Sequence, residues 1–307
     1  MMILKTVPGV AGRIKRLEIQ GATNIAISAV KALSQELKDF GGSKEEIDHV
    51  LTEATRMLVE SRATEPMMRN GLKYIRSQLT AEAPSSRDSF KKVVTQIEER
   101  ILEMYQGGRQ HIMEIGAKRI RDGDIILTHC HSSAVTGALM LAHEMGKVFK
   151  VINTETRPKY QGRITSRELV EAGIDTTMIV DSAARHYMKE VDFVIVGCDA
   201  LTSEGNIINK IGTSQVALAA YEARIPFYVL GTLLKFEPIT IHGHYEAIEE
   251  RNTNEIWADP PEGLKIRNSA FDVTRRDYVS GLISEEGLIS PHSILEAIHR
   301  HYPWILD

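Results

Sequence analysis

Cysteine is scarce in this sequence of 307 residues, in which only Cys130 and Cys198 occur. Two cysteines cannot form a disulfide framework, and free thiols fit a reducing compartment. Long apolar runs are also missing, since no stretch approaches the roughly 18 apolar residues that a membrane-spanning helix needs. Residues 1–16 have neither the apolar core nor the cleavage pattern of a secretory signal. These absences predict a cytoplasmic protein without a membrane partner.

The chain has no excess of positive charge either. It contains 37 Lys and Arg against 41 Asp and Glu, which gives a net charge of −4 at pH 7. A nucleic-acid-binding surface usually requires a basic excess, so we expect no nucleic-acid partner. No G-x-G-x-x-G stands at a strand–helix turn, and neither a Walker A loop nor an H-E-x-x-H motif is present. The sequence therefore lacks the signatures of NAD chemistry and nucleotide hydrolysis, and we expect no metal site.

The pattern of apolar residues changes near Asp124. Before this point apolar residues recur with the period of a helix, as at Ile25, Val30 and Leu33, and no clear strand is found. After it, short β-rich runs alternate with helical segments, which is typical of βαβ units around a parallel sheet. The sequence predicts an α/β protein: a helical N-terminal domain, 1–108, followed by a Rossmann-like α/β domain, 109–307.

The same patterns predict where the elements lie. In the first part we expect helices at 21–40, 43–60 (with a capping box of Ser43 and Glu46), from 66, and at 87–105 and 111–121, the last two separated by Gly107-Gly108. In the second part we expect strands at 125–129, 148–153, 177–180, 193–197 and 226–230, and helices at 133–143, 166–172, 183–188 and 213–224. One more strand near Tyr278 and a closing helix from Ser293 complete the prediction.

Cys130 lies where the predicted strand 125–129 turns into the predicted helix 133–143. Open α/β sheets bind ligands at such turns, because a helix start offers unpaired N–H groups to an anion. A helix N-terminus also favours the thiolate, the reactive form of cysteine. The alternative is a buried, inert side chain, since free cysteine is among the most buried residue types.

Asp199 follows the apolar run 193–197, which reads as a buried strand. In a parallel sheet its carboxylate would emerge at the same edge as Cys130. A thiol and a carboxylate at one edge can act as the base and the acid that move a proton between neighbouring sugar carbons. The alternative for Asp199 alone is a turn residue or a helix cap.

Asn209 and Lys210 lie in a segment, 204–213, that contains two glycines and precedes the helix predicted from Thr213. Together with the N–H groups near Thr213, they could hold a phosphate at the helix start. The alternative is a structural loop with a solvated lysine. Arg62 and Lys235 are further candidates for binding an anion, although each taken singly is more typical of a surface residue.

Seen together, these and other motifs resemble the archaeal ribose-1,5-bisphosphate isomerases. The wider family also contains the methylthioribose-1-phosphate isomerases and the alpha, beta and delta regulatory subunits of translation initiation factor 2B. The resemblance covers nearly the whole chain and is dense from Gly116 onward. The motifs that carry it span residues 128–132, 155–162, 181–188, 197–200, 205–213, 235–236 and 268–274.

The resemblance implies a helical domain followed by a Rossmann-like domain, with the active site between them. It assigns the catalytic thiol to Cys130 and the catalytic carboxylate to Asp199. Initiation-factor subunits commonly lack this pair, so its presence favours an enzyme. Substrate contacts carry over to Gly21, Ala22, Thr23, Arg62, Ser132, Ser133, Ala134, Asn209, Lys210 and Lys235, and Gln20 stands at a further contact position.

Two contact positions depart from the isomerase pattern. Gln20 stands where the isomerases generally have Arg, and Ser133 stands where ribose-bisphosphate isomerases can carry a basic residue. Charge-assisted contacts are the strong ones for a phosphate, so both departures bear on a substrate with two phosphates rather than on the isomerase chemistry. The Gln-Gly-Ala form is also found among initiation-factor-like members.

The predicted function is an aldose–ketose isomerase of AMP or nucleotide metabolism that converts ribose 1,5-bisphosphate to ribulose 1,5-bisphosphate. After ring opening, Cys130 as thiolate takes the C2 proton, and Asp199, kept protonated by burial, donates one. No metal or organic cofactor is required. By resemblance we expect AMP as an activator and a homodimer or homohexamer. The alternatives are a non-catalytic initiation-factor-2B-like subunit that binds a nucleotide or sugar phosphate, and an isomerase of methylthioribose 1-phosphate.

Overall fold

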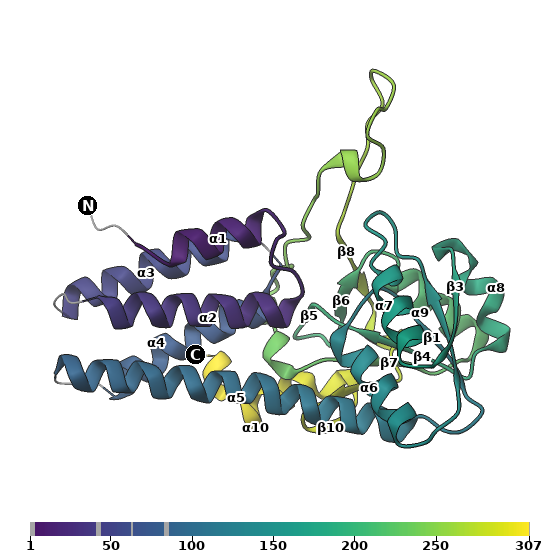
Figure 1. Ribbon diagram of the computed structural model, residues 1–307, viewed down its shortest axis with the longest axis horizontal. Helices are drawn as coiled ribbons and strands as arrows, with labels where there is room; N and C mark the ends of the chain where they lie inside the picture. The colour runs from purple at the N-terminus through teal and green to yellow at the C-terminus, as the bar shows by residue number, and fades with distance from the viewer. Residues whose placement is uncertain (1–3, 41–43, 63, 83–85, 307) are drawn as a thin grey trace. The chain divides into compact units, whose positions relative to one another are not determined.

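The computed structural model describes residues 4–40, 44–62, 64–82 and 86–306. The chain divides into two compact units, the first made of residues 1–107, 234–236 and 298–307 and the second of residues 108–233 and 237–297. Helices fill the first part of the chain and a largely parallel sheet with helices follows (Figure 1). The predicted fold class is therefore confirmed.

The first unit is built from long helices. α1 packs against α3 and α2 packs against α4, and apolar residues of α2 such as Ile25, Leu33 and Leu37 are fully buried. The predicted capping residue Ser43 lies outside the described residues. The helices are α1 (Val7–Lys15), α2 (Ala22–Asp39), α3 (Lys44–Ser61), α4 (Pro66–Glu82) and the first part of α5 (Arg87–Arg119).

Helix α1 has no counterpart in the sequence prediction, and its start depends on a residue of α2. The buried carboxylate of Glu36 accepts the backbone N–H groups of Lys5, Thr6 and Val7 at 2.8–3.1 Å. These are donors that a helix start leaves without an intrahelical partner. A carboxylate placed there also interacts favourably with the helix dipole. The contact spans about thirty residues, so no local pattern indicates it.

The predicted break at Gly107-Gly108 is wrong, because α5 runs through both glycines without interruption. Glycine in a helix interior costs about 1 kcal/mol relative to alanine. Packing on both sides of the pair offsets this cost, since Tyr105 and Ile112 are both almost fully buried. The long apolar stripe of α5 therefore outweighs the local preference of the two glycines.

The second unit contains a seven-stranded sheet in the order β10-β9-β7-β4-β1-β2-β3. All neighbours are parallel except β9 and β10. The chain moves outward from β1 to β2 and β3 and then returns to the other side of β1 as β4, so the order reverses between β1 and β4. The strands are β1 (Ile125–Thr128), β2 (Lys150–Thr154), β3 (Asp175–Ile179), β4 (Phe193–Gly197), β7 (Phe227–Leu230), β9 (Gly281–Ser284) and β10 (Gly287–Ile289).

Helices cover both faces of this sheet, as right-handed crossovers on either side of the reversal require. α6 packs beside α7, and α8 packs beside α9. The core under α6 and α7 also includes Ile112 and Ala117 from the end of α5. The helices are α6 (Ser133–Glu144), α7 (Gly162–Glu171), α8 (Ala184–Tyr187), α9 (Thr213–Ala223) and α10 (Ile294–His301), the last of which contains the boundary between the units.

A small antiparallel sheet, in the order β5-β6-β8, lies outside the main one. Its strands are β5 (Ala200–Leu201), β6 (Ile207–Lys210) and β8 (Phe271–Thr274). The segment read from sequence as a loop therefore contains a strand, and its last residue is Lys210. Between β7 and β8 the chain makes a long excursion away from the rest of the second unit, light green in Figure 1.

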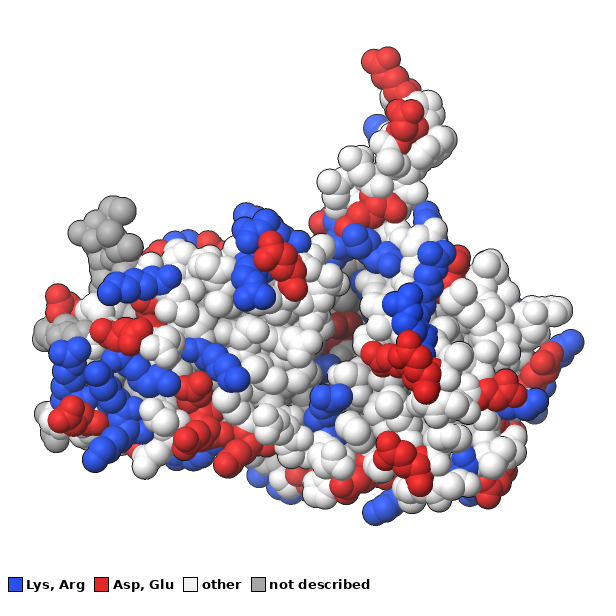
Figure 2. All heavy atoms as spheres, in the orientation of Figure 1, with Lys and Arg blue, Asp and Glu red and all other residues white. Residues whose placement is uncertain are grey.

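Acidic and basic side chains are interspersed over the face of the molecule drawn in Figure 2. Mixed charge of this kind agrees with the net charge of −4. Among the helices of the described ranges, none is both long and apolar enough to cross a membrane.

Candidate active site

Cys130 and Asp199 occupy equivalent positions on two neighbouring strands. Cys130 is the second residue after β1, and Asp199 is the second residue after β4. β1 and β4 are adjacent and parallel, so the two residues emerge side by side at the carboxyl edge of the sheet. This edge is the point where the strand order reverses, at which open α/β sheets bind their ligands. The pair is close enough for the charge of Asp199 to act on the thiol.

The backbone of Cys130 is held in the left-handed region, with φ +71°. For a residue with a β-carbon this conformation costs about 1–2 kcal/mol. Two hydrogen bonds to buried threonines offset the cost. The Cys130 N–H donates to Oγ1 of Thr156 at 2.9 Å, and Oγ1 of Thr165 donates to the Cys130 carbonyl at 2.9 Å.

Burial raises the pKa of the Cys130 thiol to about 12. The charge of Lys210 and the N–H of His131 lower this pKa, whereas the carboxylates of Asp199 and Asp181 raise it further. The thiol is consequently protonated at neutral pH. Desolvation at the strand end thus outweighs the helix start, which favours the anionic thiolate that the predicted mechanism uses.

Asp199 is half-buried rather than buried. Its backbone N–H donates to the Ile208 carbonyl at 2.8 Å, which ties the end of β4 to the small sheet. Asp199 is therefore less enclosed than the buried acid that the sequence predicted.

Lys210 ends β6 as a buried cation, with 7% of the residue exposed. Its ammonium lies 4.8 Å from the centroid of the Phe271 ring, and no salt bridge to it occurs within the described part of the chain. The alternative of a solvated lysine is therefore wrong. A buried ammonium without a carboxylate partner is a strong attractor for an anionic ligand. Asn209, also buried, donates to Oγ1 of Thr213 at 3.0 Å.

The start of α9 is already occupied by a carboxylate of the protein. Asp272 accepts hydrogen bonds from the backbone N–H groups of Gly212 at 2.8 Å and of Ser214 at 3.1 Å. The Ser214 hydroxyl also donates to this carboxylate at 2.8 Å. Burial raises the pKa of Asp272, and these three hydrogen bonds oppose that rise. The prediction that N–H groups near Thr213 hold a phosphate is therefore wrong for Gly212 and Ser214.

Within the described part of the chain, no carboxylate accepts from the N–H groups at the start of α6. Its N-cap residue, Ser132, makes no capping hydrogen bond with its side chain. The first-turn N–H groups, which include those of Ser133 and Ala134, are the donors that a helix start offers to an anion. Gly197 of β4 permits this arrangement, because a β-carbon there would lie 2.6 Å from Oγ of Ser132. The three residues Ser132, Ser133 and Ala134 are half-buried beside Cys130.

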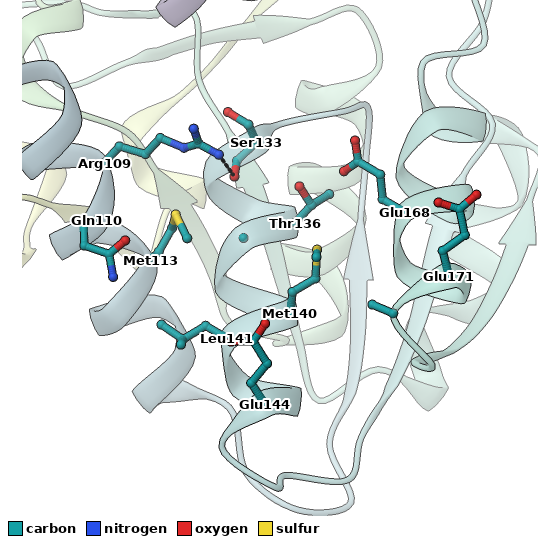
Figure 3. Close-up of a pocket in the computed structure, with 12 residues that line it drawn as sticks. Arg109, Gln110, Met113, Ser133, Thr136, Met140, Leu141, Glu144, Glu168 and Glu171 are labelled. Carbon is teal, nitrogen blue, oxygen red and sulfur yellow. Dashed lines mark hydrogen bonds between the residues drawn. The ribbon is translucent and has the colours of Figure 1, made fainter. Parts of the chain in front are cut away.

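A cavity of about 650 Å³ runs along α6, between α7 and the end of α5 (Figure 3). Of the predicted site residues only Ser133 lines it. Arg109 extends from α5 and donates to the Ser133 carbonyl at 3.4 Å. A positive charge is thus present next to Ser133, although position 133 itself carries none.

His129, which precedes Cys130, is not among the predicted site residues but lies beside them in the fold. The ring of this buried residue joins the end of β2 to the loop before α9, with Nδ1 2.6 Å from Oγ1 of Thr154 and Nε2 3.0 Å from the carbonyl of Ile211. A carbonyl only accepts, so Nε2 carries the proton and Nδ1 accepts from Thr154. Burial lowers the pKa of His129 and keeps the ring neutral. With both nitrogens hydrogen-bonded, His129 is not available as a metal ligand.

Thr156 and Asp181 also went unassigned, although both lie in stretches that carry the family resemblance. Asp181 accepts the N–H groups of Thr156 at 2.8 Å and of Arg157 at 2.7 Å. The residues are far apart in sequence from Cys130, and only the fold brings them to it. The sequence offered one signal for Thr156 and Asp181, which is that each lies within a motif shared with the family.

The remaining predicted contacts belong to the first unit. Gly21, with φ +82°, is the N-cap of α2, and that helix start, at Ala22 and Thr23, has no capping side chain. The exposed Gln20 is turned back on its own loop, with Nε2 donating to the Leu17 carbonyl at 2.8 Å.

The two basic residues of the first unit that were predicted to contact substrate lie beside groups that hold their surroundings in place. Nε of Arg62 lies 3.3 Å from the carboxylate of the buried Glu65. Lys235 ends the short helix η3 (Leu233–Lys235), and the flanking carbonyls of Leu234 and Phe236 accept from Nδ2 of Asn70 at 2.9 and 2.8 Å.

Comparison with known proteins shows that the chain is similar to one family, and that its relatives there bear three different names. The model of the family described as "Initiation factor 2 subunit family" matches residues 18–291. A ribose 1,5-bisphosphate isomerase from Methanocaldococcus jannaschii is 42% identical over 95% of this chain and 94% of its own length. The structure of a translation initiation factor eIF-2B from Pyrococcus horikoshii OT3 has a TM-score of 0.80 at 30% identity, covering 94% of this chain and 98% of its own. The structure of a 5-methylthioribose 1-phosphate isomerase from the same organism has a TM-score of 0.79 at 26% identity. It covers 96% of this chain and 88% of its own length.

Proposed function

The chain belongs to the initiation factor 2 subunit family, and we propose that within it the protein is an aldose–ketose isomerase that converts ribose 1,5-bisphosphate to ribulose 1,5-bisphosphate. The observation that supports this most is the pair of Cys130 and Asp199, side by side at the reversal of strand order, with the buried ammonium of Lys210 acting on the thiol. The relative of 42% identity bears the name of this activity.

The proposed reaction moves protons between four atoms of the substrate. Ring opening adds a proton to the ring oxygen. C2 then loses its proton, C1 gains one, and the C2 hydroxyl loses its proton as the ketone forms. Cys130 is the base at C2 and Asp199 is the acid.

The protonated thiol of the free protein fits this scheme if the two side chains exchange a proton. Transfer of one proton from Cys130 to Asp199 creates a thiolate and a carboxylic acid, which are the base and the acid that the reaction requires. We assign this transfer to the substrate complex, because burial keeps the thiol protonated in the free protein. No step requires a metal ion or an organic cofactor.

A substrate with two phosphates requires cations at both ends. Lys210 and Lys235 are the proposed phosphate contacts, together with Arg62, Asn209, the α2 start at Gln20–Thr23 and the α6 start at Ser132–Ala134. Arg109 supports the bisphosphate form, because it brings a guanidinium to Ser133, where related isomerases can carry the charge on the residue itself. We include Arg109 among the groups that hold the substrate.

Turnover of ribose 1,5-bisphosphate, followed as ribulose 1,5-bisphosphate formed, tests the proposal. We expect catalytic turnover by the wild-type chain and nearly none by Cys130→Ser protein purified in the same way, which controls for a contaminating isomerase. Turnover of methylthioribose 1-phosphate in place of the bisphosphate would move the protein to the neighbouring branch. Absence of turnover with either sugar would favour the second candidate function.

That second candidate is a non-catalytic subunit of an initiation-factor-2B-like assembly that binds a nucleotide or a sugar phosphate. Two observations favour it: the TM-score of 0.80 to an initiation factor structure, and Gln20 in place of arginine. The Cys130/Asp199 pair speaks against it, since ligand binding alone requires neither residue.

We also propose that the protein forms a homodimer or homohexamer and is activated by AMP. Apolar side chains on the excursion between β7 and β8 support self-association, since Tyr245, Trp257 and Leu264 are exposed there. The mass of the protein in solution tests the oligomeric state. The isomerase rate measured with and without AMP tests the activation.

Replacement of Lys210 by alanine is expected to raise KM for ribose 1,5-bisphosphate about tenfold to hundredfold. A charge-assisted hydrogen bond contributes about 1.5–3 kcal/mol, and each 1.4 kcal/mol is a factor of ten. Lys235→Ala should act in the same direction. The rise in melting temperature that the sugar phosphate gives to the wild type should shrink in both variants, because ligand binding to the native state stabilises it by mass action.

Lys150→Ala is the matched control, since Lys150 begins β2 at the opposite edge of the sheet and is exposed. Its KM and ligand-induced melting shift should equal those of the wild type. An unchanged melting shift in both Lys210→Ala and Lys235→Ala would locate the phosphates elsewhere.

A further inference from the structure

Cys130 adopts a backbone conformation that favours glycine, yet the residue there carries a side chain. Its φ of +71° lies in the left-handed region, which residues with a β-carbon rarely adopt. Glycine would adopt it without strain. Strain that persists at one residue of a candidate site indicates that the surrounding structure enforces it and that the side chain is needed in that direction.

The enforcing contacts come from the loop after β2. The buried hydroxyl of Thr156 accepts the N–H of Cys130 at 2.9 Å. Thr156 is itself left-handed, with φ +62°, and is fixed by Asp181, which accepts its N–H at 2.8 Å and that of Arg157 at 2.7 Å. The loop is therefore held at two successive N–H groups, and its hydroxyl is presented to Cys130 from a fixed position.

We propose that Thr156, held by Asp181, is a positioning residue that directs the Cys130 thiol toward Lys210 and Asp199. The expected effect of Thr156 on kcat rests on the proposed isomerase function. The effect of Thr156 on the direction of the thiol does not, because it requires no substrate. Thr156 acts on the reaction only through Cys130.

The physical reason lies in the pairing of the Cys130 N–H. Without an acceptor, that N–H is left unsatisfied in a largely buried loop, which is unfavourable, and nothing opposes the strain of the left-handed conformation. Cys130 then relaxes toward an ordinary conformation. Because φ and ψ set the direction of the Cα–Cβ bond relative to the sheet, the relaxation turns the thiol away from Lys210 and Asp199 and toward solvent.

The test compares Thr156→Val with Thr156→Ser, both in a Cys198→Ala background, so that Cys130 is the only thiol. Valine keeps the size and branching of threonine but cannot accept a hydrogen bond, whereas serine can. For Thr156→Val we expect kcat for ribose 1,5-bisphosphate to fall about tenfold to hundredfold with KM changed less than about threefold, since a displacement of 1 Å can cost a hundredfold. Thr156→Ser should recover most of the loss.

Alkylation of Cys130 by iodoacetamide, measured against pH without substrate, gives a second readout. A thiol released from its half-buried position should react severalfold faster at pH 8, and its apparent pKa should fall from about 12 toward the ordinary value of about 8.5. Slower isomerisation combined with faster alkylation is a combination that general loss of stability below the melting temperature does not produce. Thr176→Val, a threonine on β3 that donates to the Ile174 carbonyl, is the matched control and should change neither rate.

Asp181→Asn extends the test if Thr156→Val does not fold. An amide offers one acceptor to the two N–H groups, so the loop loosens, while loss of the Asp181 charge by itself favours the thiolate. A fall in kcat supports positioning, and an unchanged or higher kcat contradicts it. The proposal would be overturned if Thr156→Val had the same alkylation rate and the same kcat as the wild type. If the wild type had no isomerase activity, the proposed function would fail, whereas the alkylation comparison would still decide whether Thr156 positions the thiol.

Discussion

Replacement of Cys130 by serine should reduce kcat for ribose 1,5-bisphosphate by at least about 10²–10⁴, the usual worth of a positioned acid or base. Serine has almost the size of cysteine and keeps the backbone N–H and carbonyl that Thr156 and Thr165 bind. Its hydroxyl, however, releases a proton far less readily than a thiol, even a thiol whose pKa burial raises to about 12. The melting temperature should stay close to that of the wild type. Initial rates of ribulose 1,5-bisphosphate formation measure the effect.

Cys198 is the control for this experiment, as the other cysteine of the chain. Its buried sulfur packs against Gly231, where a β-carbon would lie 2.1 Å from Sγ. Cys198→Ala should leave kcat unchanged and lower the stability by about 0.5–3 kcal/mol, the common range for a single substitution. A Cys130→Ser protein that turns over at the wild-type rate would show that the thiol is not the base.

Replacement of Asp199 by asparagine should lower kcat by about 10²–10⁴ while substrate binding survives. Asparagine keeps the size of the side chain and one acceptor, but its amide cannot release a proton at a useful rate. The change removes a negative charge near the proposed phosphate contacts, so KM should stay constant or fall. Rates and the melting shift with ribulose 1,5-bisphosphate measure catalysis and binding separately.

Asp192→Asn is the matched control, because Asp192 directly precedes β4 and lies at the opposite end of the strand from Asp199. Its carboxylate accepts the N–H of Ile125 at 2.7 Å, a contact that an amide oxygen can keep. It should retain full activity. Full activity in Asp199→Asn would remove this carboxylate from the mechanism, and a protein that no longer folds would make Asp199 a structural residue of the strand end. For a binding subunit, Asp199→Asn would leave ligand affinity nearly unchanged and there would be no activity to lose.

Prediction of the fold succeeded where the signal is periodic and local. The alternation of apolar runs after Asp124 predicted the strands that contain the site, and β1 and β4 begin and end close to the predicted positions. It failed where long-range packing overrides a local preference. The glycine pair at 107–108 continues a helix because its flanks are buried, and Lys210 ends a strand because Ile207–Lys210 pairs with β8, more than sixty residues later.

The sequence alone determined the fold class and the positions of Cys130 and Asp199 directly after two strands, because the identity and order of residues decide which side chain follows which strand. Only the tertiary structure decided the environment of the thiol and of the two helix starts. The thiol of Cys130 is protonated because burial, a property of everything packed around it, outweighs the favourable start of α6. The start of α9 is closed to a phosphate because Asp272 reaches it across about sixty residues, whereas no described carboxylate accepts from the start of α6. Such contacts join residues far apart in the chain, and their distances exist only after folding.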